Sequence, residues 1–392
     1  MLFIFCVIFS YCIKILVYFL LKRRKISANN NSGSEPKSFS VEIIIPMYNE
    51  RKVILGTVRN VLCINHKNLL ITIIDDGSND GSLDLVRENF QEYSQVQILH
   101  QVNKGKSVAL NYAIGNSTRD IIICIDADTL VKPNIVEKIL PYFNEEKVAA
   151  VSGNIRVGNR KNLITNLQHL EYITNPNYER AVFEVLNGIM VVPGAIGAFR
   201  RSIVANIGGY TNDTLTEDSE ITMKILCNDY IIRNAVDVIG YTEAPASLKT
   251  FFNQRIRWKV GTVQVLIKYR KKIFSIRNKA LAQLVIPYTW IFGIILPLLI
   301  PMVDYIFFYH ILILNETSVL LSYFLFILID GLVCSTILLR NNEPKQIFHI
   351  ILHRLFLRHL IQFTYFAIML KFIKGGLFKW ENSVRYGNNK ID

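Results

Sequence analysis

The sequence has few cysteines, and none of them stands at a spacing that binds zinc or builds a disulfide framework. The 392 residues include six cysteines, which form no Cys-x-x-Cys pair and lie largely in apolar surroundings. This usage excludes a zinc module and a small disulfide-stabilised secreted protein. It is what a domain in the reducing cytoplasm would have.

Acidic residues are scarce relative to basic ones. The chain has 31 Asp and Glu against 44 Lys and Arg, which gives a formal net charge of +13. Nucleic-acid-binding motifs are absent, so this charge favours anionic lipid and a phosphorylated substrate as partners over nucleic acid. Internal repeats are also missing, and the one polar, linker-like stretch is 26–40.

Long hydrophobic runs are present at both ends, without a signal-peptide cleavage site after the first. Residues 2–21 contain one charge, Lys14, and precede the basic run 22–25. That order predicts a retained membrane anchor with its following end in the cytoplasm. Residues 281–301 and 317–339 are further expected spans. Segment 347–373 either crosses the bilayer or lies in its interface, which leaves the side of the C-terminus open.

Between the hydrophobic ends, apolar strands alternate with helical segments. Strands are predicted at 41–46, 69–74, 96–100, 120–125 and 148–152, and Asn49 is expected to cap a helix ending near Leu62. A long helical stretch is expected from about Lys161 to Glu184. The alternation predicts an α/β fold, with a mainly parallel, Rossmann-like sheet covered by helices on both faces.

Two carboxylates, Asp126 and Asp128, follow directly after an isoleucine-rich strand. Residues two apart in a strand point to the same face, and open α/β sheets bind ligands beyond the carboxyl ends of their strands. Two convergent carboxylates suit Mg²⁺ or Mn²⁺ carrying phosphates. A polar turn closing a core strand is the alternative interpretation.

Three more polar sites punctuate this region: Asp75/Asp76, Lys104/Lys106 and Glu217/Asp218. The first could accept hydrogen bonds from a nucleoside, and the lysines could neutralise phosphate. Asp218 could take a proton from an acceptor hydroxyl. Turn formation, solvated surface charge and an ordinary acidic helix start are the respective alternatives.

A helical stretch before the C-terminal spans carries Gln254, Arg257 and Trp258 at positions i, i+3 and i+4. These side chains therefore share one helical face. An indole can stack on a sugar ring, and an arginine can bind phosphate oxygens bidentately. A basic helix at the membrane surface, anchored by its tryptophan, is the alternative, and the two interpretations are compatible.

Taken in order, these motifs resemble the processive membrane-bound family 2 glycosyltransferases, which include the bacterial synthases of cellulose, chitin oligomers, hyaluronan and poly-N-acetylglucosamine. The resemblance covers roughly residues 40–270 and rests on Pro46-Met-Tyr-Asn-Glu50, Asp75-Asp-Gly-Ser78, Lys104-Gly-Lys106, Asp126-Ala-Asp128, Thr216-Glu-Asp218 and Gln254-Arg-Ile-Arg-Trp258. Within the family, segments 192–200, 213–218 and 257–264 look most like the poly-β-1,6-N-acetylglucosamine synthases.

The resemblance implies a GT-A domain and a role for each matching residue. Asp218 would be the catalytic base of an inverting transfer, and Asp128 with Asp126 would hold Mg²⁺ or Mn²⁺. The remaining implied roles are nucleotide-sugar binding by Pro46, Tyr48, Glu50, Asp75, Asp76, Lys106, Asp126 and Glu217, and acceptor or diphosphate binding by Gln254, Arg257, Trp258 and Gly194.

The resemblance also implies a multi-pass protein of the bacterial plasma membrane with a cytoplasmic catalytic domain. Its expected partners are a UDP-sugar, most readily UDP-N-acetylglucosamine, a growing polysaccharide and the lipid bilayer, with a small accessory subunit as a further candidate. The expected regions are an N-terminal span (1–22), a linker (23–40), the GT-A domain (41–245), an interfacial region (246–279), a C-terminal membrane region (280–374) and a tail (375–392).

Alternative activities stay open at this point. The poly-β-1,6-N-acetylglucosamine synthases often carry two N-terminal spans where this chain has one, a layout also like that of the chitin-oligomer synthases. Hyaluronan, chitin-oligosaccharide and glucan synthesis therefore remain candidates. Single transfer to a lipid acceptor and a catalytically silent subunit that binds nucleotide-sugar are the other two hypotheses.

Overall fold

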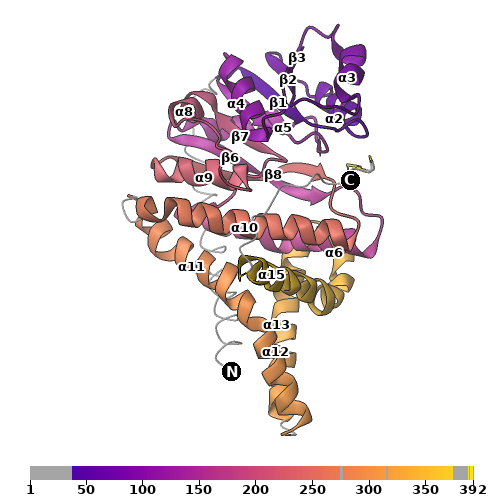
Figure 1. The fold of residues 1–392 in the computed structure, drawn as a ribbon, viewed down its shortest axis with the longest axis vertical. Helices are drawn as coiled ribbons and strands as arrows, with labels where there is room; N and C mark the ends of the chain where they lie inside the picture. The colour runs from indigo at the N-terminus through magenta and orange to yellow at the C-terminus, as the bar shows by residue number, and fades with distance from the viewer. Residues whose placement is uncertain (1–37, 274–276, 315–316, 374–386, 388, 392) are drawn as a thin grey trace.

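The computed structural model describes residues 38–273, 277–314, 317–373, 387 and 389–391. The predicted N-terminal span, most of the linker and most of the tail lie outside these residues. Eight strands form one sheet in the order β3-β2-β1-β4-β7-β6-β8-β5 (Figure 1). Their bounds are β1 (Val41–Met47), β2 (Leu69–Asp75), β3 (Val96–His100), β4 (Ile121–Cys124), β5 (Leu130–Val131), β6 (Val148–Val157), β7 (Gly197–Arg200) and β8 (Ile231–Thr242).

Fourteen α-helices lie within the described residues. They are α2 (Ile54–Leu62), α3 (Ser82–Phe90), α4 (Lys106–Asn116), α5 (Ile135–Ile139), α6 (Leu163–Tyr172), α7 (Tyr178–Phe183), α8 (Arg201–Asn206), α9 (Glu217–Cys227), α10 (Leu248–Ile273), α11 (Ile286–Trp290), α12 (Leu296–Leu312), α13 (Thr317–Arg340), α14 (Ile350–Leu352) and α15 (Arg358–Ile373). The described 3₁₀ segments are η1 (Leu140–Asn144), η3 (Glu184–Leu186) and η6 (Pro344–His349), and the π segments are η2 (Ile173–Asn177), η4 (Leu281–Val285), η5 (Ile291–Ile295) and η7 (His353–Leu357).

The sheet is mixed: four of its seven strand pairings are parallel, in line with the expected mainly parallel sheet, and three are antiparallel. Strands β3, β2, β1 and β4 are mutually parallel, as the alternation predicted. Strand β7 then runs antiparallel to both of its neighbours, β4 and β6. Strands β6 and β8 pair in parallel, and the short β5 closes the edge antiparallel to β8. Strand β7 follows β6 in the chain after the long helical stretch of α6, η2 and α7.

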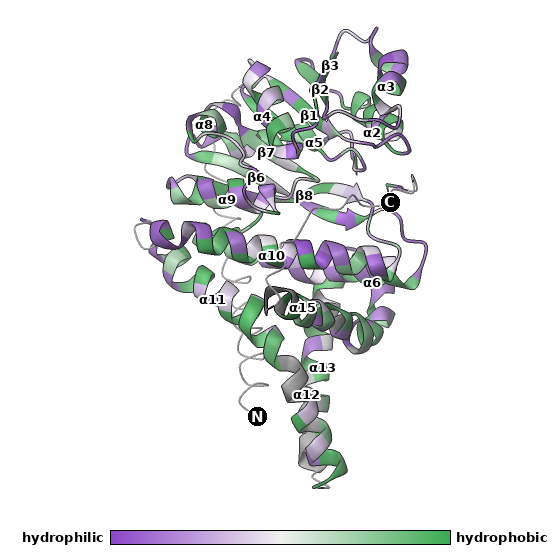
Figure 2. Ribbon diagram, viewed as in Figure 1, coloured by the Kyte–Doolittle hydropathy of each residue, from purple (hydrophilic) through white to green (hydrophobic). Residues whose placement is uncertain are grey.

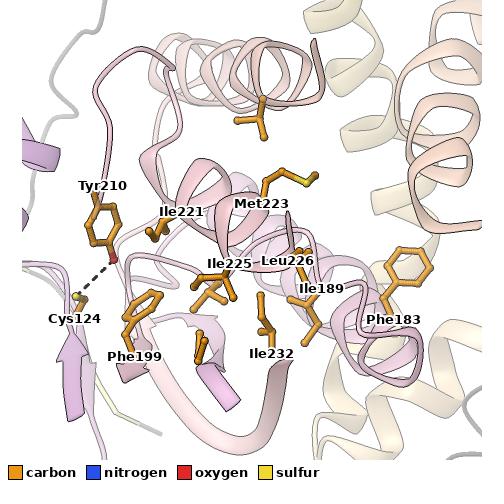
Figure 3. Packing of buried hydrophobic residues seen from close by; sticks show 14 of the residues in the cluster. Cys124, Phe183, Ile189, Phe199, Tyr210, Ile221, Met223, Ile225, Leu226 and Ile232 are labelled. Atoms are coloured by element: carbon orange, nitrogen blue, oxygen red, sulfur yellow. Dashed lines mark hydrogen bonds between the residues drawn. The ribbon is translucent and has the colours of Figure 1, made fainter. Parts of the chain in front are cut away.

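Two hydrophobic cores cover the two faces of the sheet. The central strands supply both, since β4 is buried along its whole length. Helices α2, α3 and α5 close one core, and helices α4, α8 and α9 close the other. In the second core, Ile221 and Ile225 of α9 lie toward Phe199 of β7 and Tyr210, and Leu226 lies beside Ile189 (Figure 3).

The second core continues past the sheet into the C-terminal helices. Figure 1 shows α10 lying between the sheet and helices α11 to α15. The same cluster of buried apolar side chains includes Val265 and Leu266 of α10, Leu281 and Val285 of η4, and Ile337 and Leu338 of α13. The sheet and the C-terminal helices therefore share one core.

Ion pairs reinforce the junction between the sheet and the C-terminal helices. Glu343, which follows α13, has its carboxylate 3.3 Å from Arg156, 3.6 Å from Arg160 and 3.2 Å from the His169 ring. Arg156, Arg160 and His169 belong to the segment from β6 to α6. Charges from both regions are thus neutralised across the junction.

One described helical segment, Leu281–Leu299, is long and apolar enough to cross a membrane, and it falls within the predicted span 281–301. The second predicted span corresponds to α13, and segment 347–373 is helical with a π segment at η7. Arg354 of η7 donates to the Oδ1 atom of Asp330 on α13 at 3.0 Å. Exposed apolar side chains gather on α12 to α15, which are largely green in Figure 2.

One local prediction was wrong. Helix α2 begins at Ile54 with Val53 at its N-cap, whereas Asn49 lies in the preceding turn at φ 57° and accepts a hydrogen bond from Asn79. The long helical stretch expected from about Lys161 to Glu184 is confirmed, since α6, η2, α7 and η3 follow one another without a break from Leu163 to Leu186. Its π segment contains Pro176, which has no N–H to donate within a regular α-helix.

Candidate active site

The turn after β4 presents its two aspartates in different environments. The Thr129 N–H donates to the Asp126 carbonyl at 2.9 Å and closes the turn. The Asp126 side chain is 28% exposed. Asp128 is buried, and its Oδ1 atom accepts a hydrogen bond from Thr242 of β8 at 3.2 Å. Asp126 is therefore open to a ligand, while Asp128 is held against the sheet.

Lys106 connects three of the predicted sites. Its ammonium lies 2.6 Å from Oδ1 of Asp126 and 3.0 Å from Oε1 of Glu217. A Cβ atom at Gly194 would lie 2.9 Å from the same nitrogen and 3.5 Å from Asp126 Oδ1. Although burial opposes the charge of Lys106, these two carboxylates hold its pKa above the ordinary value. The structure thus brings the Lys106, Asp126, Gly194 and Glu217 segments to one place.

Glu217 and Asp218 open helix α9 beside this lysine, with Thr216 at the N-cap. Burial and the neighbouring Glu217 charge raise the pKa of Asp218 to about 6, against the opposing charges of Lys106 and Arg257. Burial would also raise the pKa of Glu217, but Lys106 and Arg257 lower it. One carboxylate is thereby kept ionised, and the other has the pKa of a proton acceptor working near neutrality.

Helix α10 carries the remaining predicted residues, and its Arg257 lies near enough to Glu217 and Asp218 to affect both carboxylates. Among the described residues, nothing donates to the buried Oε1 atom of Gln254. The Trp258 ring lies 6.2 Å from the Tyr172 ring, measured between centroids. This face of α10 therefore combines a free hydrogen-bond acceptor, a cation and an aromatic surface.

Sequence reasoning missed two residues that support Trp258. The Arg255 guanidinium lies 4.4 Å from the centroid of the Trp258 ring and 4.9 Å from that of Phe251. It also donates to Glu171 of α6 at 2.6 Å, and both residues are buried. Arg255 stands inside the recognised motif, but nothing in the sequence signals its partner 84 residues away.

Asp75 and Asp76 are bonded to neighbouring loops of their own chain. Asp76 accepts from the N–H groups of Lys104 and Gly105, both at 2.9 Å, and so holds the loop that leads into α4. Asp75 contacts the His100 ring at 2.8 Å. Both carboxylates are buried. The observed contacts position the Lys106 loop, and direct nucleotide contacts by these aspartates remain a prediction.

The turn carrying Tyr48 and Glu50 follows β1, in which Pro46 pairs in register with Ile74 of β2. The Glu50 N–H donates to Ser82 at 3.0 Å. The turn therefore lies against the segment after β2, as expected if both segments contact one nucleoside. Their roles in binding remain predictions.

A divalent cation fits this site only as a partner of a phosphorylated ligand. The described part of the chain contains no group of three or more His, Cys, Asp or Glu side chains able to hold a metal. Asp126 and Asp128 supply two carboxylates, and Mg²⁺ is commonly held by one or two carboxylates together with substrate phosphates. The residues present thus suit an ion that is completed by a diphosphate.

The end of the chain lies against the same turn. The side-chain amide of Asn389 donates to the carbonyl oxygens of Asp128 and Tyr241, the second at 3.1 Å. A Cβ atom at Gly158 would lie 2.7 Å from the amide oxygen of Asn389. Figure 1 places the C-terminus beside β8.

Residues 42–208 match the family model described as Glycosyl transferase family 2. Poly-beta-1,6-N-acetyl-D-glucosamine synthase of Staphylococcus aureus (strain COL) is 27% identical over 262 residues, which cover 67% of this chain and 62% of that protein. Probable glycosyltransferase YdaM of Bacillus subtilis (strain 168) is 30% identical over 270 residues, which cover 67% of this chain and 64% of that protein. The matches thus span less than two thirds of these relatives.

A comparison of structures supports the same fold. The mannosyltransferase PcManGT from Pyrobaculum calidifontis, solved in complex with GDP-Man and Mn²⁺, superposes with a TM-score of 0.58 at 18% identity, covering 93% of this chain and 95% of that one. The likeness confirms the expected α/β class, with a mixed sheet of GT-A type and helices on both faces.

Proposed function

This chain belongs to glycosyltransferase family 2 through residues 42–208, and we propose that it is an inverting, metal-dependent glycosyltransferase that polymerises a UDP-sugar at the membrane. One observation carries the proposal: Lys106 binds both Asp126, after β4, and Glu217, directly beside the proposed base Asp218. Residues that would hold the donor diphosphate and residues that would activate the acceptor therefore meet at one lysine.

In the proposed reaction the acceptor hydroxyl oxygen bonds to C1 of the donor sugar as the bond from C1 to the diphosphate oxygen breaks. The hydroxyl proton passes to Asp218, and the nucleoside diphosphate leaves. Lys106 and Arg257 lie where they could bind phosphate oxygens. A divalent cation held by Asp126 and Asp128 would offset the charge that develops on the leaving group.

The acceptor end would be bound by α10. The Trp258 indole offers a flat surface for a sugar ring, and the Gln254 amide oxygen offers an acceptor for its hydroxyls. Because this surface adjoins the C-terminal helices, a product held there would be extended rather than released. This arrangement favours a polymer over single transfer to a lipid.

We propose UDP-N-acetylglucosamine as the donor and poly-β-1,6-N-acetylglucosamine as the product. The support is the similarity to the Staphylococcus aureus synthase together with the matching segments 192–200 and 257–264. The same proposal places the protein in the plasma membrane, with its sheet on the cytoplasmic side and the polymer passing between its spans. The apolar segment Leu281–Leu299 supports a membrane location.

The test uses membrane vesicles containing the full chain, each candidate UDP-sugar in turn, and Mg²⁺ or Mn²⁺. Polymer that is cut by a β-1,6-specific glycosidase and forms from UDP-N-acetylglucosamine alone is the expected product. Asp218→Asn should lower the rate by about 10²–10⁴-fold, whereas the exposed control Asp237→Asn should match the unmodified protein. Full activity of Asp218→Asn would remove the base assignment, and short lipid-linked products would favour single transfer.

A further inference from the structure

One face of helix α10 carries five residues, of which the proposed reaction uses only the first two. Gln254, Arg257, Gly261, Gln264 and Lys268 follow one another at intervals of three and four, so they line one face of the helix. The first two belong to the proposed acceptor site. The last three, which we name the α10 stripe, contact the chain immediately before and after Asp218.

The first two contacts of the α10 stripe hold the residues just ahead of helix α9. A Cβ atom at Gly261 would lie only 2.3 Å from the hydroxyl oxygen of Thr216, so the absence of a side chain lets the helix touch the N-cap of α9. One turn further along, the side-chain oxygen of Gln264 accepts from the Leu215 N–H at 2.9 Å. The approach to Asp218 is thus bonded to α10.

Lys268 holds the segment from both sides of Asp218. Its ammonium lies 3.1 Å from Oγ1 of Thr211 and 2.9 Å from Oδ1 of Asp213, which precede the base. It also lies 2.8 Å from Oε1 of Glu220, which follows it. Glu220 is fully buried and accepts a second hydrogen bond from Tyr269. Lys268 therefore joins both flanks of the base to one helix.

Residues 211–216 need such external support because they form neither helix nor strand. Their position relative to the acceptor cannot come from backbone hydrogen bonding of their own. The same helix that presents Gln254 and Arg257 supplies most of the described side-chain bonds to this segment. The distance between base and acceptor is then set along a single rigid element.

We propose that Lys268 is a positioning residue, which acts together with Gly261 and Gln264. These residues fix Asp218 at the distance and angle that an acceptor bound at Gln254 and Arg257 requires. The expected effect on the reaction rate rests on the proposed function. The expected effect on the structure of residues 211–218 rests on the observed contacts alone. A displacement of about 1 Å at a reacting group can lower a rate about 10²-fold.

The experiment compares Lys268→Met, Lys268→Arg and Gln264→Ala with the exposed control Lys271→Met on the same helix, in the full chain in membranes. Lys268→Met should lower kcat about 10- to 100-fold, with a smaller change in the KM for the UDP-sugar, since Lys268 contacts Thr211, Asp213 and Glu220 and none of the proposed donor residues. Lys268→Arg should restore most of the rate because a guanidinium can reach the same three oxygens. An equal loss in Lys271→Met, or a loss expressed in the donor KM alone, would overturn the inference.

A second readout does not depend on activity. Hydrogen exchange at the amides of 211–218 should quicken in Lys268→Met and Gln264→Ala, while exchange in β1, β2 and β4 stays as in the unmodified protein. Unchanged exchange at 211–218 would overturn the positioning role even if polymer is made. If exchange quickens in the variants while the unmodified protein makes no polymer, the positioning role stands and the proposed function is rejected.

Discussion

Arg255 and Glu171 form a buried ion pair of 2.6 Å between α10 and α6, and the guanidinium of this pair stacks on the ring of Trp258. A charged pair is thereby used to fix the orientation of an aromatic surface. Burial raises the pKa of Glu171, although the Arg255 charge opposes the rise. Each of the two buried charges is therefore stabilised by the other.

Breaking this pair should destabilise the protein and disturb the acceptor surface. We expect Glu171→Gln to cost ~3–5 kcal/mol of unfolding free energy, because it leaves the Arg255 charge buried without a counter-ion. Thermal unfolding in detergent measures the loss. The surface carboxylate change Glu145→Gln, which breaks an exposed pair with Arg233, should cost less than about 1 kcal/mol. Equal effects of the two changes would contradict the account.

The activity should depend on the protonation of Asp218. Since burial and Glu217 raise its pKa to about 6, the rate should fall about tenfold per pH unit below that value and level off above it. Glu217→Gln removes the neighbouring negative charge, so the acidic limb of the pH–rate profile should move to lower pH. A limb that stays in place or moves upward would show that Glu217 does not act on the base.

The divalent cation should act through nucleotide binding. Treatment with a chelator is expected to abolish polymer formation, and Mn²⁺ or Mg²⁺ should restore it. Titration of UDP by calorimetry gives a readout without turnover: affinity should increase with Mn²⁺ in the unmodified protein and show no such increase in Asp126→Asn. If Asp126→Asn kept the full metal effect, the cation would have to bind elsewhere.

A single methyl group at Gly194 should disturb the donor site. The added Cβ of Gly194→Ala would lie 2.9 Å from the Lys106 ammonium and force it away from Asp126. We expect a raised KM for the UDP-sugar without loss of folding, because the obstruction is the end of a flexible side chain. Gly115→Ala is the matched control, since open space surrounds its added methyl group. An unchanged donor KM in Gly194→Ala would place the donor away from this residue.

Much of this arrangement could be predicted from local patterns. The isoleucine run at β4 and the Thr216 N-cap of α9 are short-range signals, and parallel strands bring polar residues at their carboxyl ends to one edge. Strand β8 went unpredicted because its burial pattern breaks alternation near an irregularity in its pairing with β6. The reversed β7 has only four residues, too few to carry a period. The pairing of Glu171 with Arg255 could not be predicted, because no sequence periodicity links residues that lie 84 positions apart.

Because the sheet and the C-terminal helices share one core, a fragment that contains the sheet alone should not fold stably. A fragment ending at residue 245 would lose Val265 and Leu266 from beneath α9 and expose apolar surface to water. It would also leave Arg156 and Arg160 without the Glu343 carboxylate. Such a fragment should aggregate, so biochemical work on this protein calls for the whole chain extracted in detergent or nanodiscs.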